Sequence, residues 1–291
     1  AHAEPTEFIS YFVKGEGTPR PGILKIPVRE EIARDYRLTI DYPEDLSLLR
    51  IILNALGPDA STDEVCRFLD LHPYLMEINR LPEVSVYTCA HNAEAYIGRS
   101  VGSSLAALPG NGEFIFVDDF SSDRTVVEAE STLCRSPHTL IMNDENIGLA
   151  SSCNRALDAA RGKYIIRVDA DDRLDWSAIT RMIAEIKRTK AAVVYPAYRE
   201  IDGGDQFLGG GVKNPREHHH AGCALFDVRA LQEIRFREGL RHWDSLDLFR
   251  RLSKRFSVAY IDDPLWEYRI HGKSMSTPSA ERDDAKKRIS K

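Results

Sequence analysis

The sequence lacks any apolar run approaching the ~20 residues needed to cross a bilayer, and no signal-peptide pattern opens it. Cysteine is scarce: there are five in 291 residues, widely spaced and without a Cys-x-x-Cys pair. An odd, scattered set of this kind predicts reduced thiols and not a disulfide framework or a zinc site. We therefore expect a cytoplasmic protein with no transmembrane segment.

An excess of basic residues is also missing. The formal net charge is -6, and no basic stripe stands out that could neutralise phosphates. The composition thus argues against a nucleic-acid partner. The contents of hydrophobic residues (43%) and charged residues (29%) are ordinary for a globular protein. A chain of this length is enough for one large domain with an appendage, or for two modest domains.

The most informative stretch is 163–172, a short apolar run that ends in Asp169, Asp171 and Asp172. It predicts a buried strand with Asp-x-Asp at its C-terminal end, where open α/β sheets bind ligands. Two carboxylates one residue apart can reach one hard divalent cation and a diphosphate bound to it, and their oxygen ligands suit Mg²⁺ or Mn²⁺. The alternative is a solvated acidic turn before a helix, with Asp175 as N-cap.

Apolar strands and amphipathic helices alternate before this stretch. We expect strands at 83–89, 113–117 and 138–142, and helices at 93–108, 123–133 and 149–161. This βαβαβαβ order predicts an α/β fold, a mostly parallel sheet with helices on both faces. Polar residues follow each strand and then meet at one edge of the sheet: Cys89 to Asn92, Asp118-Asp119, Asn143 to Asn146, and Asp169 to Asp172. Four polar strand ends at one crevice predict a binding site.

The first 81 residues have a pattern of their own. We expect a strand at 37–41 and helices at about 43–56, 61–69 and 73–78, followed by a junction at Leu81-Pro82. Residues 38–46, with 76–79, resemble the C-terminal end of the cytidylyltransferases that make CMP-activated acidic sugars. That resemblance implies that Asp41 matches a metal-holding residue. Because the nucleotide-binding part of such an enzyme is absent here, we interpret residues 1–81 as a mostly helical remnant.

Four motifs in residues 84–172 occur in a familiar order: Val84 to Asn92, Val117 to Thr125, Asn146 to Ala150 with Asn154, and Val168 to Asp172. Together they resemble the inverting family 2 glycosyltransferases of GT-A fold, over about residues 83–275. Cys89 stands where that family usually has proline. The resemblance implies metal-dependent transfer of a sugar, with inversion, from a nucleoside diphosphate donor to a hydroxyl of a glycan or related acceptor.

In that family the Asp that ends the second strand accepts a hydrogen bond from the nucleotide base, which corresponds to Asp118, with Asp119 alongside. An ionised carboxylate only accepts, so it selects a ring N–H of uracil, thymine or guanine and favours UDP, dTDP or GDP donors. The alternative role is capping of the turn at 121–125. The donor contacts implied by the resemblance are Thr88, Ala90, Asn92, Asp118, Asp119, Asn146, Asn154 and Asp169.

The same resemblance places Asp171 on the metal, Mn²⁺ or Mg²⁺. Residues 266–276 are similar to a closing Tyr-Arg-x-His element of the family, which implies that His271 joins the metal or the diphosphate. Taken alone, His271 would be an ordinary loop histidine.

Inverting transfer needs a general base for the proton of the acceptor. Residues 236–252 are similar to the Glu-Asp-x-Asp segment of the family, but Ser245 stands where the base is expected. Asp244 is our first choice for the base and Asp247 our second, with His242 as a more distant alternative. Asp244 could also serve as a helix N-cap.

Three features leave alternatives open. Gly203-Gly204 and Gly209 to Gly211 flank a short expected strand at 206–208, and they indicate either a mobile acceptor loop lined by Lys213 and His218 to His220, or a hairpin turn. The histidine run could be a chance metal site or a polar loop. Residues 276–291 form a polar tail, so the domains expected are 1–81, 82–275 and 276–291.

Two rival functions remain possible from the sequence alone. A nucleotidyltransferase acting through Asp41, or a bifunctional cytidylyltransferase and glycosyltransferase, would release pyrophosphate from CTP. A non-catalytic module would bind the nucleotide sugar without transferring it, and serine at position 245, where the family has its base, is consistent with that alternative.

Overall fold

The structure is a computed structural model that describes residues 36–134, 136–240 and 243–272. The chain divides into two compact units, residues 1–80 and 81–291. His242 and the tail at 276–291 lie outside the described residues. The helices and strands are α1 (Pro43–Leu56), α2 (Thr62–Leu71), the 3₁₀ helix η2 (Pro73–Glu77), β1 (Val84–Ala90), α3 (Ile97–Ala107), β2 (Gly112–Asp118), α4 (Thr125–Leu133), β3 (His138–Met142), α5 (Leu149–Ala159), β4 (Tyr164–Arg167), β5 (Arg173–Leu174), α6 (Ala178–Thr189), β6 (Val193–Ile201), β7 (Leu225–Asp227), α7 (Val228–Glu233), α8 (Asp244–Leu252) and β8 (Val258–Arg269).

The first unit is helical in its described part, as expected. Pro begins both α1 and η2, where no N–H is needed, and Ser61 caps α2 through a capping box with Glu64. The strand expected at 37–41 is not formed, because the described part of this unit offers no strand to pair with it. Four buried side chains instead make its core, Leu48, Ile52, Leu69 and Leu75.

Asp45 holds the entry to α1. Its carboxylate accepts hydrogen bonds from the backbone N–H groups of Asp41 and Tyr42, and from the side chains of Arg37 and Asn79. Burial opposes ionisation of Asp45, but these donors outweigh it and lower its pKa to about 2. Asp41, in contrast, has an exposed side chain that pairs with Arg37 at 3.2 Å.

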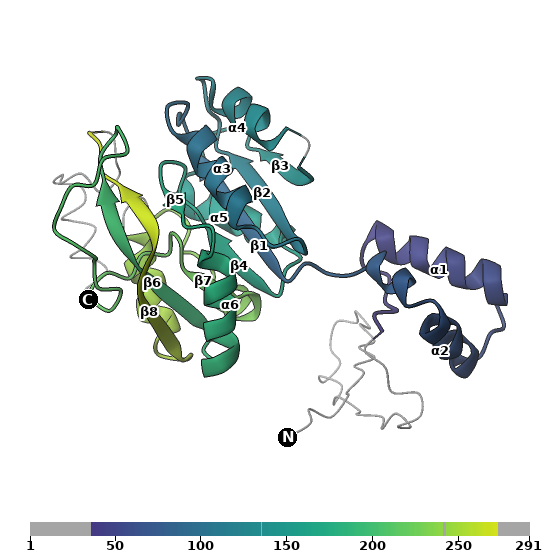
Figure 1. Ribbon diagram of the computed structural model, residues 1–291. Helices are drawn as coiled ribbons and strands as arrows, with labels where there is room; N and C mark the ends of the chain where they lie inside the picture. Colours follow the sequence, from purple (N-terminus) through teal and green to yellow (C-terminus); the bar gives the residue numbers. More distant parts are fainter. Residues whose placement is uncertain (1–35, 135, 241–242, 273–291) are drawn as a thin grey trace, which may run out of the picture. The chain divides into compact units, whose positions relative to one another are not determined.

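The second unit is built on an eight-stranded sheet of order β3-β2-β1-β4-β7-β6-β8-β5. Strands β3, β2, β1 and β4 are parallel, β6 and β8 are parallel, and β7 and β5 run against their neighbours. The mostly parallel α/β sheet is confirmed. The strands and helices expected in residues 83–161 also form, with bounds shifted by up to four residues at one helix start (Figure 1).

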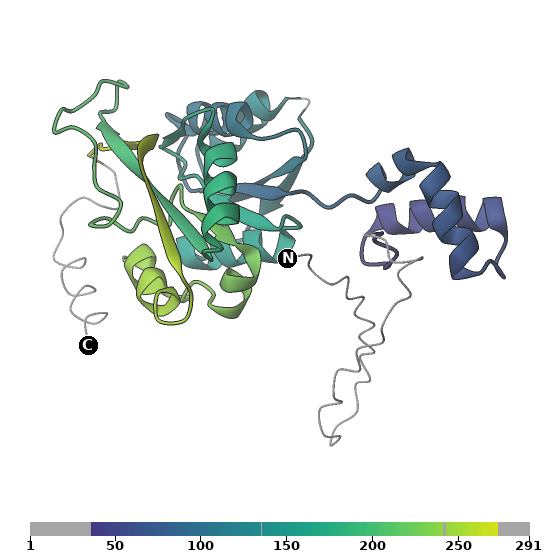
Figure 2. The same ribbon diagram turned by 60° about the horizontal axis from the view of Figure 1, so that its bottom comes forward.

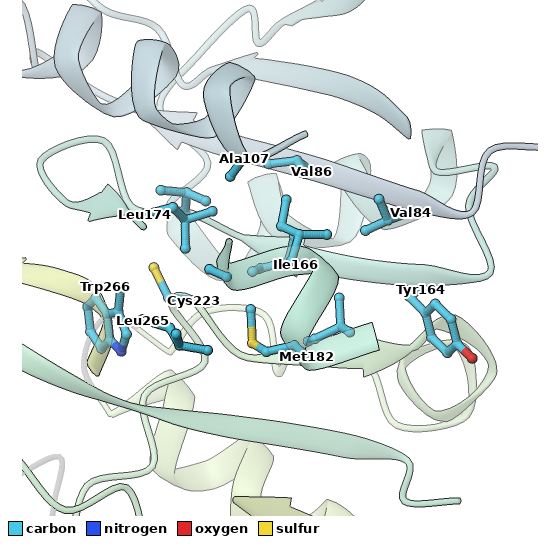
Figure 3. Packing of buried hydrophobic residues seen from close by; sticks show 14 of the residues in the cluster. Val84, Val86, Ala107, Tyr164, Ile166, Leu174, Met182, Cys223, Leu265 and Trp266 are labelled. Carbon is cyan, nitrogen blue, oxygen red and sulfur yellow. The ribbon is translucent and has the colours of Figure 1, made fainter. Parts of the chain in front are cut away.

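Helices cover both faces of this sheet, which Figure 2 shows from a second direction. One buried cluster joins the sheet to α3, α4 and α6, and the other joins it to α5, α7 and α8. Figure 3 shows part of the first cluster, where Val86 of β1, Ile166 of β4 and Met182 of α6 are all buried. Because the central strands are covered on both sides, they are apolar without alternation, as parallel strands are.

The segment after β6 is a hairpin-like turn, one of the two alternatives. The strand expected at 206–208 is reduced to a bridge between Ile201 and Phe207. Lys213 returns to β6, where its backbone N–H reaches Tyr198 and its Nζ lies 2.9 Å from Glu200. No helix in the described ranges is long and apolar enough to span a membrane.

The histidine run lies among aromatic side chains and is only partly a polar loop. The ring of His219 stacks on Phe249 of α8 at 3.4 Å between centroids, and the ring of His220 lies 5.0 Å from that of Tyr268. Burial lowers the pKa of His219, and His218 adds to this. Among the residues the structure describes, no group of three or more His, Cys, Asp or Glu side chains could hold a metal ion.

Candidate active site

The ends of the four parallel strands meet at one edge of the sheet. The backbone N–H of Asp119 donates to Ala90, that of Asn143 to Asp118, and that of Val168 to Tyr87, at 2.8 to 2.9 Å. These bonds continue the ladders beyond the strands, so the polar residues after them are neighbours. The structure thus brings the four polar strand ends together.

Asp118 and Asp119 are both buried, with 2% and 4% of their surface exposed, but they differ in their contacts. Asp119 accepts hydrogen bonds from the Asn143 side chain and from the backbone N–H groups of Ile147 and Gly148, each at 2.8 to 2.9 Å. Its two oxygens thus hold the loop before α5. Asp118 accepts from the backbone N–H of Ser121 through Oδ2, as the capping alternative expected, while its Oδ1 atom is buried with no partner in the described residues.

The remaining predicted donor contacts differ in exposure. Thr88 is fully buried in β1, and its hydroxyl has no partner in the described part of the chain. Ala90 is buried and contributes its carbonyl oxygen to the ladder. Asn92 is exposed, has a φ of 51°, and accepts from the backbone N–H of Ser122 at 2.8 Å. Asn146 is exposed on the loop held by Asp119.

Asn154 is engaged within the protein. It is 4% exposed, and its amide both donates to the backbone of Phe236 and accepts from it, at 3.0 and 3.1 Å, with a further bond to Glu238. The side chain therefore positions the segment that leads toward α8. On the same helix, Nη1 of Arg155 donates to the side-chain oxygen of Asn143 at 2.5 Å.

Three carboxylates follow β4. Asp169 and Asp171 keep partly exposed side chains, and Ser100 of α3 donates to the backbone oxygen of Asp169 at 2.8 Å. Asp172 is fully buried and accepts from the backbone N–H of Arg269. Burial raises the pKa of Asp172 well above its usual range, and repulsion by Asp171 and Asp169 adds to the shift. Burial likewise raises the pKa of Asp169, although Arg167 opposes it.

Asp171 and His271 meet although one hundred residues separate them. Nε2 of His271 lies 2.9 Å from Oδ2 of Asp171, and the imidazole packs against the ring of Tyr96 at 4.8 Å. Arg269 is fully buried beside them, and its Nε donates to the backbone oxygen of Asp171. A carboxylate suits Mn²⁺ or Mg²⁺ when a diphosphate and water supply the other ligands, and a neutral imidazole beside it favours Mn²⁺ of the two.

Asp244, the first choice for the base, reaches this site from the start of α8. Its Oδ2 atom accepts a hydrogen bond from Nη1 of Arg167 at 2.8 Å. The same guanidinium lies against Asp169, with 2.8 Å between Nε and Oδ1. Burial alone would lower the pKa of Arg167, but Asp169 and Asp244 raise it well above its ordinary value, so the group stays charged.

Asp247, the second choice, is held elsewhere. It is 4% exposed, accepts from Nε of Arg251 at 2.8 Å, and lies 3.3 Å from Arg237. Two arginines therefore occupy its oxygens. Ser245, between the two aspartates, is partly exposed on the first turn of α8.

Gly222 lies against Asp169. A Cβ atom at this position would stand 2.6 Å from Oδ2 of Asp169, closer than real contacts allow. Sequence reasoning did not single out Gly222, Arg269 or Arg167. For Arg167 a signal was present: it is a charged residue inside an otherwise apolar strand, and burial of a charge requires partners.

The family model described as "Glycosyl transferase family 2" matches residues 85–235 of this chain. The chain is 29% identical over 211 residues to the hyaluronan synthase of Pasteurella multocida, which covers 68% of this chain and 22% of the synthase. It is 28% identical to the chondroitin synthase of Escherichia coli, over 68% of this chain and 30% of that protein. The chain thus spans less than a third of these relatives.

A further relative is a glycosyltransferase of Haemophilus influenzae, 27% identical over 72% of each chain. Among solved structures, residues 1–349 of S. aureus TarS in complex with UDP-GlcNAc align with a TM-score of 0.61 at 19% identity, over 71% of this chain and 65% of that TarS chain. That likeness shows the fold, which is of GT-A type. The family match covers more than half of the sequence, and the chain belongs to glycosyl transferase family 2.

Proposed function

We propose that this chain is a metal-dependent, inverting glycosyltransferase that moves a sugar from a nucleoside diphosphate donor to a hydroxyl of a glycan. The observation that carries the proposal is the assembly of Asp169, Asp171, His271 and Asp244 at one edge of the sheet. Relatives named as hyaluronan, chondroitin and teichuronic acid biosynthesis proteins support a role in polysaccharide synthesis.

Asp118 supports a donor with a ring N–H. Its Oδ1 atom is buried without a partner in the described residues, and such an acceptor is costly unless a donor reaches it. Uracil, thymine and guanine present a ring N–H, whereas cytosine has an acceptor at the corresponding nitrogen. Because TarS is described in complex with UDP and with UDP-GlcNAc, UDP is the first candidate.

Asp171 and His271 would hold the divalent metal. When bound, the metal supplies positive charge that stabilises the leaving diphosphate. Asp169, Asp171 and Asp244 place three carboxylates at this edge with the guanidinium of Arg167, and the neighbouring Arg269 is paired with Asp205. The carboxylates therefore favour a cation here. Asp169, two residues before Asp171, would face the ribose.

Asp244 would act as the general base. It takes the proton from the acceptor hydroxyl, and that oxygen forms a bond to the anomeric carbon. The bond from this carbon to the diphosphate oxygen breaks, and its electron pair leaves with the nucleoside diphosphate. Asp247 is less suited to this role, because Arg237 and Arg251 lie at its two oxygens, whereas Arg167 contacts Asp244 at Oδ2.

Residues 1–81 remain outside this proposal. The family match begins at residue 85, and the resemblance to cytidylyltransferases stays a prediction. Asp41 has an exposed side chain paired with Arg37, and its backbone N–H donates to the Asp45 carboxylate.

The test is release of UDP from UDP-GlcNAc, UDP-GalNAc, UDP-glucose and UDP-glucuronate in the presence of Mn²⁺. We expect one of them to be consumed, with release abolished by EDTA and by Asp244→Asn. Proton NMR of the released or transferred sugar should first show the anomer opposite to that of the donor. Metal-dependent binding of UDP without turnover of any donor would instead support the binding-module alternative.

A further inference from the structure

Arg167 lies at the centre of the site, although it has no assigned role. It is the last residue of β4 and 3% exposed, and its guanidinium lies against the ring of Phe236 at 5.7 Å. Nη1 donates to Asp244, while Nε and Nη2 face the two oxygens of Asp169 at 2.8 and 3.4 Å. The buried Arg167 thus joins Asp169, on the side of the proposed donor site, to Asp244 of α8, which is 77 positions from Arg167.

The start of α8 explains why such an anchor is needed. Helix residues are about 100° apart around the axis, so a carboxylate at position 244 points in a different direction from one at position 245. The N-cap of α8 is Trp243, which has a φ of 65° and makes no side-chain cap bond, so Asp244 is the first helical residue and not the N-cap considered from the sequence. Because serine stands at position 245, where the base is expected, Asp244 must be directed toward the donor by another side chain.

We propose that Arg167 is a positioning residue that holds the Asp244 carboxylate toward Asp169 and so fixes the base relative to the donor. This inference rests on the proposed function, because it assigns the base to Asp244. Asp169 also pairs with the Arg167 guanidinium, so Arg167 orients Asp244 while its charge is shared between the two carboxylates. Gly222 keeps the place beside Asp169 open.

The first measurement is hydrogen exchange of the free chain, which needs no donor. Arg167→Gln removes the anchor, and amides in residues 243–249 should exchange at least about tenfold faster, while those of α6 stay unchanged. Asp244→Asn should give a similar change, and the double variant no more than the larger single effect. Arg188→Gln is the control, because Arg188 is an exposed arginine that pairs with Glu185 of its own helix, α6.

The second measurement separates positioning from a general structural role. UDP release from the donor that turns over is compared with the dissociation constant of UDP in the presence of Mn²⁺. Arg167→Gln should lower kcat by about tenfold or more and change the UDP affinity by less than about threefold, and in the Asp244→Asn background it should cost little further. Arg167→Lys keeps the charge and should recover part of kcat, although it cannot pair with both carboxylates.

The outcomes are distinguishable. Unchanged exchange in residues 243–249 of Arg167→Gln would overturn the inference whether or not a donor is known. Independent, additive losses of kcat in Arg167→Gln and Asp244→Asn would also overturn it. Failure of the wild-type chain to bind UDP or consume any of the donors would overturn the proposed function, while the exchange result would still decide whether Arg167 holds Asp244. If Arg167→Gln does not fold, Arg167→Lys and Asp244→Asn carry the same comparison.

Discussion

Nε2 of His271 lies 2.9 Å from Oδ2 of Asp171, across one hundred residues of sequence. Asp171 follows β4 near the middle of the sheet, whereas His271 follows β8 close to its edge. Their contact therefore depends on how the sheet places the segment after β8 beside the segment after β4. Arg269 and Tyr96 support the pair, one through the backbone of Asp171 and the other through its ring.

Gly222→Ala should weaken binding of UDP with Mn²⁺ by about tenfold or more. The added Cβ would stand 2.6 Å from Oδ2 of Asp169 and must displace that carboxylate. Overpacking of this kind costs about 1–3 kcal/mol. Gly110→Ala is the matched control, because a Cβ there meets nothing within 4 Å. Calorimetry of UDP checks both variants, and an unchanged affinity in Gly222→Ala would show that Asp169 does not contribute to donor binding.

Asp119→Asn should destabilise the second unit by about 3 kcal/mol. The wild-type carboxylate accepts three N–H hydrogen bonds. In the variant, the NH₂ group of the amide would face at least one of these N–H donors and could not accept from it. Urea unfolding of the variant and the wild type measures the difference. A loss below about 1 kcal/mol would show that the carboxylate is not needed to hold the loop before α5.

Asp118→Asn should change stability little but weaken UDP binding. The amide oxygen can still accept from the Ser121 N–H, so the stability loss should stay below about 1 kcal/mol. Binding of UDP should fall by at least about tenfold, because an NH₂ group can replace the free acceptor that faces the base. Titration of UDP and CDP against the variant checks this, and UDP binding equal to that of the wild type would remove Asp118 from base recognition.

The first unit should lose stability in acid through Asp45. The pKa of this group is lowered from 3.8 to about 2 in the folded unit. Its contribution is therefore fully present above about pH 4 and is lost as the pH falls toward 2. Hydrogen exchange of α1 amides, corrected for the intrinsic dependence on pH, should show this loss in the wild type. In Asp45→Asn the same amides should be less protected at pH 7, with little further change on acidification.

The sequence predicted what depends on local pattern. Apolar runs predicted the strands, because the central strands are buried on both faces. The N-caps considered for the later helices were wrong, since Ser177 and Trp243 stand there in place of Asp175 and Asp244. The pairing of Asp171 with His271 followed from a family motif and not from spacing. The expected strand at 37–41 failed because the described part of its unit gives it no partner.

The roles of several polar residues could not be predicted, because their partners are distant in sequence. Asn154 looked like a ligand contact, but its amide binds the backbone of Phe236, 82 residues away. The buried charge of Arg167 is shared by Asp169, two residues away, and by Asp244, which comes to it over 77 residues. Asp244 was preferred to Asp247 as the base from the sequence, and that choice stays a prediction. The arginines around Asp247, which the pattern of α8 does not reveal, support it.

The central claim is that Asp171 belongs to a metal-dependent donor site. It is tested most directly by calorimetric titration of UDP, GDP, dTDP and CDP with Mn²⁺ against the wild type, Asp171→Ala and Asp262→Ala, a control with an exposed side chain. We predict that the wild type and Asp262→Ala bind one diphosphate other than CDP only when Mn²⁺ is present, and that Asp171→Ala loses this binding. Binding that is indifferent to Mn²⁺ and to Asp171→Ala, or no binding of any diphosphate to the wild type, would contradict the account.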